Sequence, residues 1–169
     1  MSELRWNPLL SEWVVTATAR QERTFLPPAD HCPLCPTSPG RFPTEIPAYD
    51  FEIVCFENLF PTFSFPPPPI AISGDELYRV APALGICEVV VYTPRHEGTL
   101  TDCSVEEIYK LLLVWSDRFK ELGRKKEIKY VFIFENKGEE IGVTLSHPHG
   151  QIYAFSYIPP LIKRELNSC

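Results

Sequence analysis

Short runs of apolar and β-branched residues predict the strands of this chain. Such runs occur at residues 13–19, 51–56, 86–92, 130–134 and 151–157. The run I-C-E-V-V-V-Y at 86–92 is the most strongly β-branched and stops before Pro94, which cannot continue a strand ladder. None of the runs reaches the length of a buried helix, so their pattern favours strands.

A helical period begins at Ser104. The sequence Ser104-Val105-Glu106-Glu107 predicts a capping box, in which the Ser104 hydroxyl and the Glu107 carboxylate each accept a backbone N–H. Apolar residues then recur at helical spacing until Gly123, and we expect all of them to face the core: Ile108, Leu111, Leu112, Trp115, Phe119 and Leu122. Residues 160–166 predict the start of a second helix.

Strands around one long helix, without strand and helix in alternation, predict an α+β domain on an antiparallel sheet. The chain has 169 residues, 44% of them hydrophobic, which suffices for one domain with a core. Its net charge of −6 excludes a basic nucleic-acid-binding face. No apolar run approaches the roughly 18 residues of a membrane span, and the first residues lack the apolar core of a signal peptide. We therefore expect a soluble, cytoplasmic protein.

Proline is unusually frequent, at 18 of 169 residues against a usual ~5%, and most of it precedes residue 95. Residues 24–50 are therefore expected to form an irregular loop. This loop contains Cys32 and Cys35 in a C-x-x-C motif. A redox pair normally begins a helix, whereas T-S-P-G follows this motif, so half of a metal site is the favoured interpretation. Two unreactive thiols remain the alternative.

The motif H-P-H-G-Q carries the chemistry. Side chains two residues apart share a face of extended backbone, so His147, His149 and Gln151 are expected to project together. Packing alone does not place two imidazoles and an amide on one face; a solvated strand edge is the alternative. Pro148 stiffens the backbone between the imidazoles, and we expect Gly150 to let a ligand approach the main chain.

The longer segment F-E-N-K-G-x-x-x-G-x-x-x-x-H-P-H-G-Q resembles the active-site signature of the galactose-1-phosphate uridylyltransferase family, a branch of the histidine-triad superfamily. Supporting matches cover most of the chain: the C-x-x-C motif, Y-T-P-R-H at 92–96, F-E-N-L-F at 56–60, and the pair Arg20 and Arg23. The resemblance implies a histidine-triad-like fold. It also implies that residues 1–169 form one domain, equivalent to the N-terminal half of a two-half enzyme.

The resemblance implies a double displacement. His149 would attack the α-phosphorus of UDP-glucose, expel glucose 1-phosphate and hold UMP until galactose 1-phosphate takes it. Gln151 would donate a hydrogen bond to a phosphoryl oxygen. The hydrolase branch has a third histidine there, and glutamine cannot transfer a proton, which favours a transferase. Two alternatives stay open: an adenylyl-transferring relative similar to ADP-glucose phosphorylase, and a zinc-stabilised half-domain that is not catalytic alone.

By the same resemblance, Cys32, Cys35, His96 and His147 would bind one structural zinc ion, because two thiolates and two imidazoles complete a tetrahedral set. His31 is expected to be a solvated loop residue. Glu165 matches a carboxylate of the family's second metal site, whose other ligands would lie beyond residue 169, so no second metal is expected.

The resemblance also implies the substrate contacts and a homodimer. The phosphates would be contacted by Asn136, Gly142 and Thr144; the uracil and ribose pocket would be lined by Leu34, Phe56, Asn58, Phe60 and Val89; Arg20 and Arg23 would reach phosphates across the dimer interface. Leu59 stands where the family usually has an aspartate, and this keeps the adenylyl alternative open.

Overall fold

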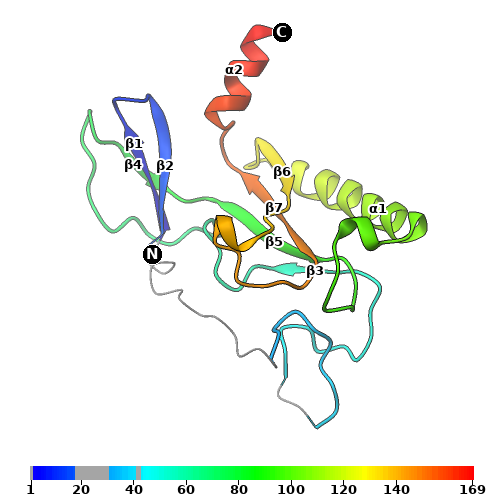
Figure 1. Cartoon of the computed structure of the whole chain (residues 1–169). Helices are drawn as coiled ribbons and strands as arrows, with labels where there is room; N and C mark the ends of the chain where they lie inside the picture. Colours follow the sequence, from blue (N-terminus) through cyan, green and yellow to red (C-terminus); the bar gives the residue numbers. More distant parts are fainter. Residues whose placement is uncertain (1, 18–30, 41–42) are drawn as a thin grey trace.

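Two antiparallel β-sheets and two α-helices form the part of the chain that this computed structural model describes, residues 2–17, 31–40 and 43–169 (Figure 1). The elements are β1 Ser2–Asn7, β2 Glu12–Ala17, β3 Val54–Glu57, β4 Val80–Pro82, β5 Gly85–Val91, α1 Val105–Gly123, β6 Tyr130–Phe134, β7 His149–Phe155 and α2 Pro160–Ser168. The α+β class is confirmed. The expectation of a single sheet is wrong.

The smaller sheet has the strand order β2-β1-β4 and the larger has the order β3-β5-β7-β6. The expected strands correspond to β2, β3, β5, β6 and β7, although β3 begins only at Val54 and β7 begins already at His149. Residues 18–19 of the first expected strand lie outside the described residues. Strands β1 and β4 were not expected. The three residues of β4 form a strand only by pairing with β1, which is far away in the sequence.

The larger sheet separates the helix from the H-P-H-G-Q motif. In the register of β5 and β7, Val91 lies opposite His149 and Val89 lies opposite Gln151, so these side chains share one face. Helix α1 covers the other face, where Leu111 and Leu122 pack with residues of β5, β6 and β7 in the main hydrophobic core (Figure 1). The motif therefore lies on the face that α1 leaves uncovered.

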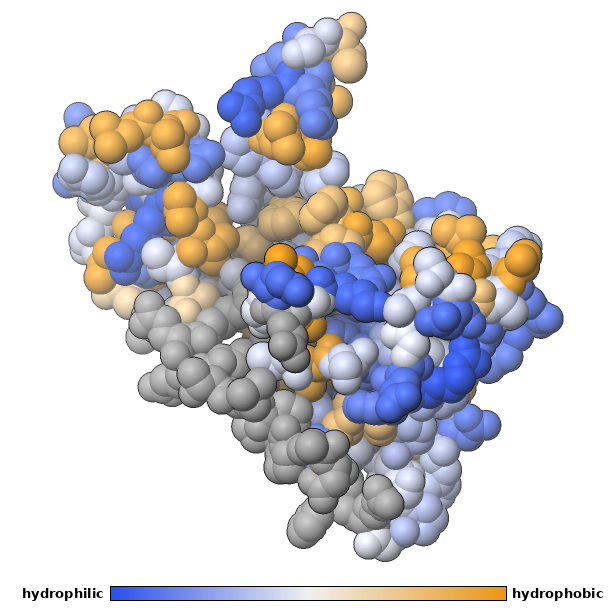
Figure 2. Space-filling model, in the orientation of Figure 1, coloured by the Kyte–Doolittle hydropathy of each residue, from blue (hydrophilic) through white to orange (hydrophobic). Residues whose placement is uncertain are grey.

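The capping box of α1 is confirmed. Ser104 Oγ accepts the N–H of Glu107 at 3.2 Å, and Glu107 Oε2 accepts the N–H of Ser104 at 2.7 Å. The expectation that all its apolar residues are core is wrong for Leu112 and Phe119, which are 49% and 51% exposed. The apolar stripe is wider than the strip of helix that the sheet covers. Figure 2 accordingly shows hydrophobic side chains at the surface over α1.

An ion pair ties α1 to the sheet. Arg118 Nε donates to Glu88 Oε2 at 2.9 Å, and the Glu88 side chain on β5 is almost completely buried. The thiol of Cys55 on β3 donates to the same carboxylate. Burial, reinforced by the Glu88 charge, raises the pKa of Cys55 to about 12, so this thiol stays protonated.

The smaller sheet packs on the larger one through Leu4, Phe63 and Cys87, with Tyr153 and Phe155 beside them. Helix α2 extends away from both sheets and buries none of its residues (Figure 1). Among the described residues, none of the helices is both long and apolar enough to cross a membrane.

Gly150 is needed for packing inside the sheet, because protein atoms fill the place that a side chain would take here. A Cβ at this position would lie 2.1 Å from Tyr92 Oη and 3.0 Å from the carbonyl oxygen of Phe134. Both atoms belong to the protein, and Tyr92 is part of the core beneath α1. The glycine therefore lets Tyr92 pass behind the strand that carries His149.

We predict that Gly150→Ala lowers the free energy of unfolding by about 1–3 kcal/mol, because the added methyl group must displace the buried Tyr92 ring. Urea denaturation followed by circular dichroism measures this loss. Gly123→Ala is the matched control, since a Cβ there meets nothing within 4 Å. Equal stability of Gly150→Ala and the parent protein would contradict the packing argument.

Candidate metal centre and active site

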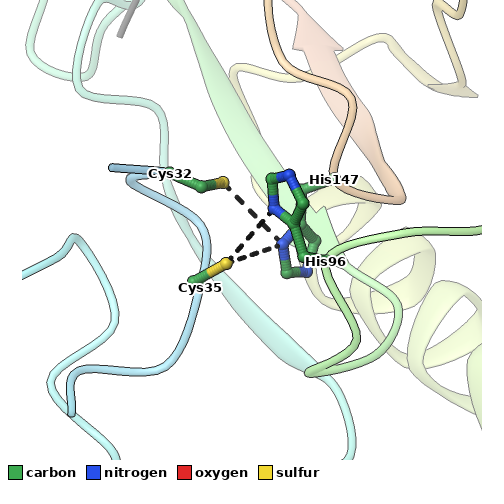
Figure 3. Close-up of side chains that lie close together, drawn as sticks. All are labelled: Cys32, Cys35, His96 and His147. Carbon is green, nitrogen blue, oxygen red and sulfur yellow. Dashed lines mark hydrogen bonds between the residues drawn. The ribbon is translucent and has the colours of Figure 1, made fainter. Parts of the chain in front are cut away.

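Four side chains from three separate segments converge beside the larger sheet (Figure 3). Cys32 and Cys35 come from the proline-rich loop, His96 follows β5, and His147 immediately precedes Pro148 and β7. Their donor atoms all lie within 4.8 Å of one another. Cys35 Sγ is 3.4 Å from His96 Nδ1 and 3.5 Å from His147 Nδ1, and Cys32 Sγ is 3.8 Å from His147 Nδ1.

Hydrogen bonding prepares His147 as a ligand. Its Nε2–H donates to the carbonyl oxygen of Thr93 at 2.8 Å, so the lone pair of the neutral ring is on Nδ1, which faces the thiols. Burial lowers the pKa of His147 and keeps the ring neutral. Burial, with Cys32 adjacent, raises the pKa of Cys35 to about 11, so a bound metal ion must displace the thiol proton.

The donor set fits a metal ion. Sulfur and imidazole donors at the usual zinc distances in a tetrahedral arrangement lie roughly 3.5 Å apart, close to the three separations found here. Two thiols and two imidazoles would also fill all four positions of a tetrahedral metal ion with donors from the protein. The four residues expected from the sequence thus come together as a group that can hold a metal ion.

The C-x-x-C loop is also held by its own contacts. Thr44 Oγ1 donates to the carbonyl oxygen of Cys35 at 2.7 Å, which joins the two ends of the loop. Leu34 and Ile46 are buried at 2% and 1% exposure against Val89 of the sheet. The loop therefore lies on the face of the sheet that carries His149.

The H-P-H turn connects the metal centre to His149. His149 Nδ1–H donates to the backbone carbonyl oxygen of His147 at 2.7 Å. In the neutral ring this leaves the lone pair on Nε2. The orientation of His149 is thus set by the backbone of a residue whose side chain belongs to the metal centre.

Three cavities in the described structure border His149. The largest has a volume of about 430 Å³ and includes Glu135, Lys137 and Ser146 in its lining. The second, of about 250 Å³, is lined in part by Ile141, Leu145 and Gln151. The third, of about 50 Å³, lies next to Leu145 and Gln151. His149 therefore faces a hollow surface on several sides.

The residues expected to contact substrate fall into these cavities with few exceptions. Asn136, Gly142 and Thr144 line the second cavity together with Gln151. The third cavity is lined by four of the residues expected in the uracil and ribose pocket: Leu34, Asn58, Phe60 and Val89. Phe56 packs behind Leu34 and Val89 in an apolar cluster. Arg20 and Arg23 lie outside the described residues.

Several features of the site go beyond the expected contacts. Gln151 Oε1 is buried and has no hydrogen-bond partner among the described residues, which is unusual for an amide in a sheet. Glu45 lines the third cavity and was missed, because a single glutamate in a proline-rich loop carries no sequence signal. Glu97 and Lys137 line the largest cavity and were also not expected there, although Lys137 lies within the F-E-N-K-G segment.

Comparisons with known proteins identify the family of the chain. Residues 1–159 match the family described as galactose-1-phosphate uridyl transferase, N-terminal domain. A galactose-1-phosphate uridylyltransferase from Thermotoga maritima is 40% identical over 168 residues, which are 99% of this chain and 51% of that protein. The chain spans about half the length of the curated relatives it matches.

Solved structures give the same relation. A uridylyltransferase structure superposes with a TM-score of 0.82 at 31% identity, over 98% of this chain and 50% of the other. An ADP-glucose phosphorylase from Arabidopsis thaliana, solved with bound ADP-glucose, gives a TM-score of 0.65 at 26% identity over 99% and 53%. On the match over residues 1–159, the chain belongs to the galactose-1-phosphate uridyl transferase family and corresponds to its N-terminal domain.

Proposed function

We propose that the protein is a hexose-1-phosphate uridylyltransferase that exchanges UMP between UDP-glucose and galactose 1-phosphate through a covalent intermediate on His149. The observation that carries this proposal is the hydrogen bond of 2.7 Å from His149 Nδ1–H to the His147 carbonyl oxygen, which leaves Nε2 as a nucleophile beside the cavities. The names of the relatives support the choice of substrates.

In the first step, the Nε2 lone pair forms a bond to the α-phosphorus, and the bond from this phosphorus to the leaving hexose 1-phosphate breaks. The ring becomes positively charged, and the His147 carbonyl oxygen stabilises this charge through the bond it already accepts from Nδ1–H. In the second step, a phosphate oxygen of galactose 1-phosphate attacks, the N–P bond breaks, and the ring returns neutral.

Gln151 would stabilise the phosphoryl group in both steps. It lies two residues from His149 on the same face and lines the second cavity with Asn136 and Thr144. Its buried amide has an oxygen without a partner among the described residues, and a half-turn of the amide would present the NH₂ donors at that place. Gly142, with a φ of +78°, lines the same cavity.

We assign zinc to the metal group. Cys32, Cys35, His96 and His147 would supply all four ligands, so the ion would have no open position for substrate and would be structural. The metal would hold the proline-rich loop against the sheet. It would also fix His147, whose carbonyl oxygen orients His149.

The oligomeric state and location follow from the same proposal. We propose that the protein acts as a homodimer whose site is shared between subunits, with Arg20 and Arg23 reaching the phosphates of the partner's site. We propose a cytoplasmic location, where reducing conditions keep the thiols of Cys32 and Cys35 available as ligands.

Mass spectrometry of the metal-loaded chain after incubation with UDP-glucose or with ADP-glucose tests the proposal. We expect a uridylyl adduct from UDP-glucose, located by peptide mapping to the peptide that contains His149, and much less adduct from ADP-glucose. Addition of galactose 1-phosphate should remove the adduct. An adduct from ADP-glucose alone would establish the adenylyl alternative, and no adduct from either donor would show that this half is not catalytic alone.

A further inference from the structure

Tyr92 follows β5 and contacts the H-P-H-G-Q motif from the core beneath α1. The residue is 3% exposed, and its ring lies edge-on to Trp115 with 6.0 Å between the centroids. Its backbone N–H donates to the carbonyl oxygen of Pro148 at 3.2 Å, and its Oη lies where a side chain of Gly150 would be. Tyr92 thus contacts the chain immediately before and immediately after His149.

The Tyr92 hydroxyl also donates to a carboxylate beside the candidate active site. Tyr92 Oη is 3.4 Å from Glu135 Oε2, and Glu135 lines the largest cavity together with His149. Burial, reinforced by the Glu135 charge, raises the pKa of Tyr92, so the hydroxyl stays protonated and acts as the donor. The bond therefore joins the packed core to an exposed side chain at the cavity wall.

Glu135 stands where β6 ends and the segment that borders the cavities begins. β6 ends at Phe134, and Asn136, which follows Glu135, lines both larger cavities beside His149. A carboxylate repels phosphate, so the side chain of Glu135 is not suited to contact the α-phosphate itself. Because it is bonded to the core at this point, it can instead fix the direction in which the chain leaves β6.

We propose that Tyr92 is a positioning residue for nucleotidyl transfer, which acts through the hydrogen bond from its hydroxyl to Glu135. Its backbone and ring hold the chain on both sides of His149, and its hydroxyl holds the chain beside Asn136. The nucleophile and the amide placed at the phosphates would then keep one relative position, and a displacement of about 1 Å can cost on the order of 10²-fold in rate. This inference rests on the proposed nucleotidyl transfer and does not depend on which base the donor carries.

Quench-flow mass spectrometry of metal-loaded Tyr92→Phe, at several concentrations of the donor that labels the parent chain, tests the inference. The variant keeps the packed ring and the backbone N–H. The maximal rate of adduct formation should fall by about tenfold, the equivalent of one hydrogen bond. The half-saturating donor concentration should stay within about twofold, because the groups that bind the donor remain and only their alignment is lost. Tyr109→Phe, which changes an exposed tyrosine on α1, is the matched control and should keep the parent rate.

Variants of Glu135 show whether the Tyr92 hydroxyl acts through this side chain. Glu135→Ala should slow adduct formation about as much as Tyr92→Phe, since each removes the same hydrogen bond. Glu135→Gln keeps an oxygen that accepts the hydroxyl and should recover most of the rate that Glu135→Ala loses. In the double variant Tyr92→Phe/Glu135→Ala, the two losses should not multiply.

The outcomes separate this inference from the function on which it rests. A parent rate in Tyr92→Phe, a Glu135→Gln variant as slow as Glu135→Ala, or losses that multiply in the double variant would overturn the role of Tyr92 alone. A slower Tyr92→Phe whose melting temperature falls and whose donor affinity falls equally would show a structural role and would also overturn it. A parent chain that forms no adduct with any donor would overturn the proposed function and this inference with it.

Discussion

Removal of the metal ion should lower the melting temperature by at least about 10 °C, the shift that a loss of several kcal/mol produces in a chain of this size. The ligands join three segments that are far apart in the sequence, and the cysteine loop otherwise reaches the sheet mainly through Leu34 and Ile46. Without the metal, Leu34 and Ile46 remain the most deeply buried contacts between the described part of the loop and the sheet. Calorimetry before and after chelation, with the zinc content determined, measures the shift.

The loss of stability after metal removal should begin at the metal centre. The core between α1 and the larger sheet contains none of the four ligands, so hydrogen exchange should increase first at residues 31–40 and 43–50 and at the turn before His149. Cys35→Ser should reproduce the effect of chelation, and Cys169→Ser, an exposed cysteine at the far end of α2, should not. An apoprotein that melts at the same temperature as the metal-loaded protein would contradict the structural role.

Local sequence signals identified the elements that depend on local interactions. The capping box at Ser104 and the β-branched run of β5 predicted their elements almost to the residue, because a cap and a strand pattern act over a few neighbours. Strand β4 escaped prediction because it exists only by pairing with β1. The exposure of Leu112 was missed because helical periodicity does not show how wide a strip the sheet covers.

The candidate site shows the same difference between local and long-range interactions. Spacing alone predicted that His149 and Gln151 share a face, and the strand register confirms this. The gathering of the cysteines and histidines was expected from a family resemblance, since no spacing rule relates residues 32 and 147. Glu45 and the contact between Gly150 and Tyr92 required the folded chain, because each depends on backbone brought together from distant segments.

His149→Asn should abolish the uridylyl adduct, with a loss in the rate of its formation on the order of 10⁴-fold or more, because asparagine has no ring nitrogen that can attack phosphorus. The fold should remain intact. His149 is half-buried, and among the described residues its ring bonds to the His147 carbonyl oxygen, a bond which the asparagine amide can partly replace. Quench-flow mass spectrometry with UDP-glucose gives the rate, and calorimetry gives the melting temperature, expected within about 2 °C of the parent.

Gln151→Ala provides the graded comparison, because it removes a hydrogen-bond donor and leaves the nucleophile in place. The adduct should still form, about 10²–10³-fold more slowly. His31→Asn, a change in a loop histidine outside the metal group, should retain the parent rate.

If the adduct persisted in His149→Asn, another side chain would have to be the nucleophile, and the hydrogen bond from Nδ1 to the His147 carbonyl oxygen would have only a structural role. Loss of the metal ion from His149→Asn would show that the His149 side chain also helps to hold His147 in the metal centre.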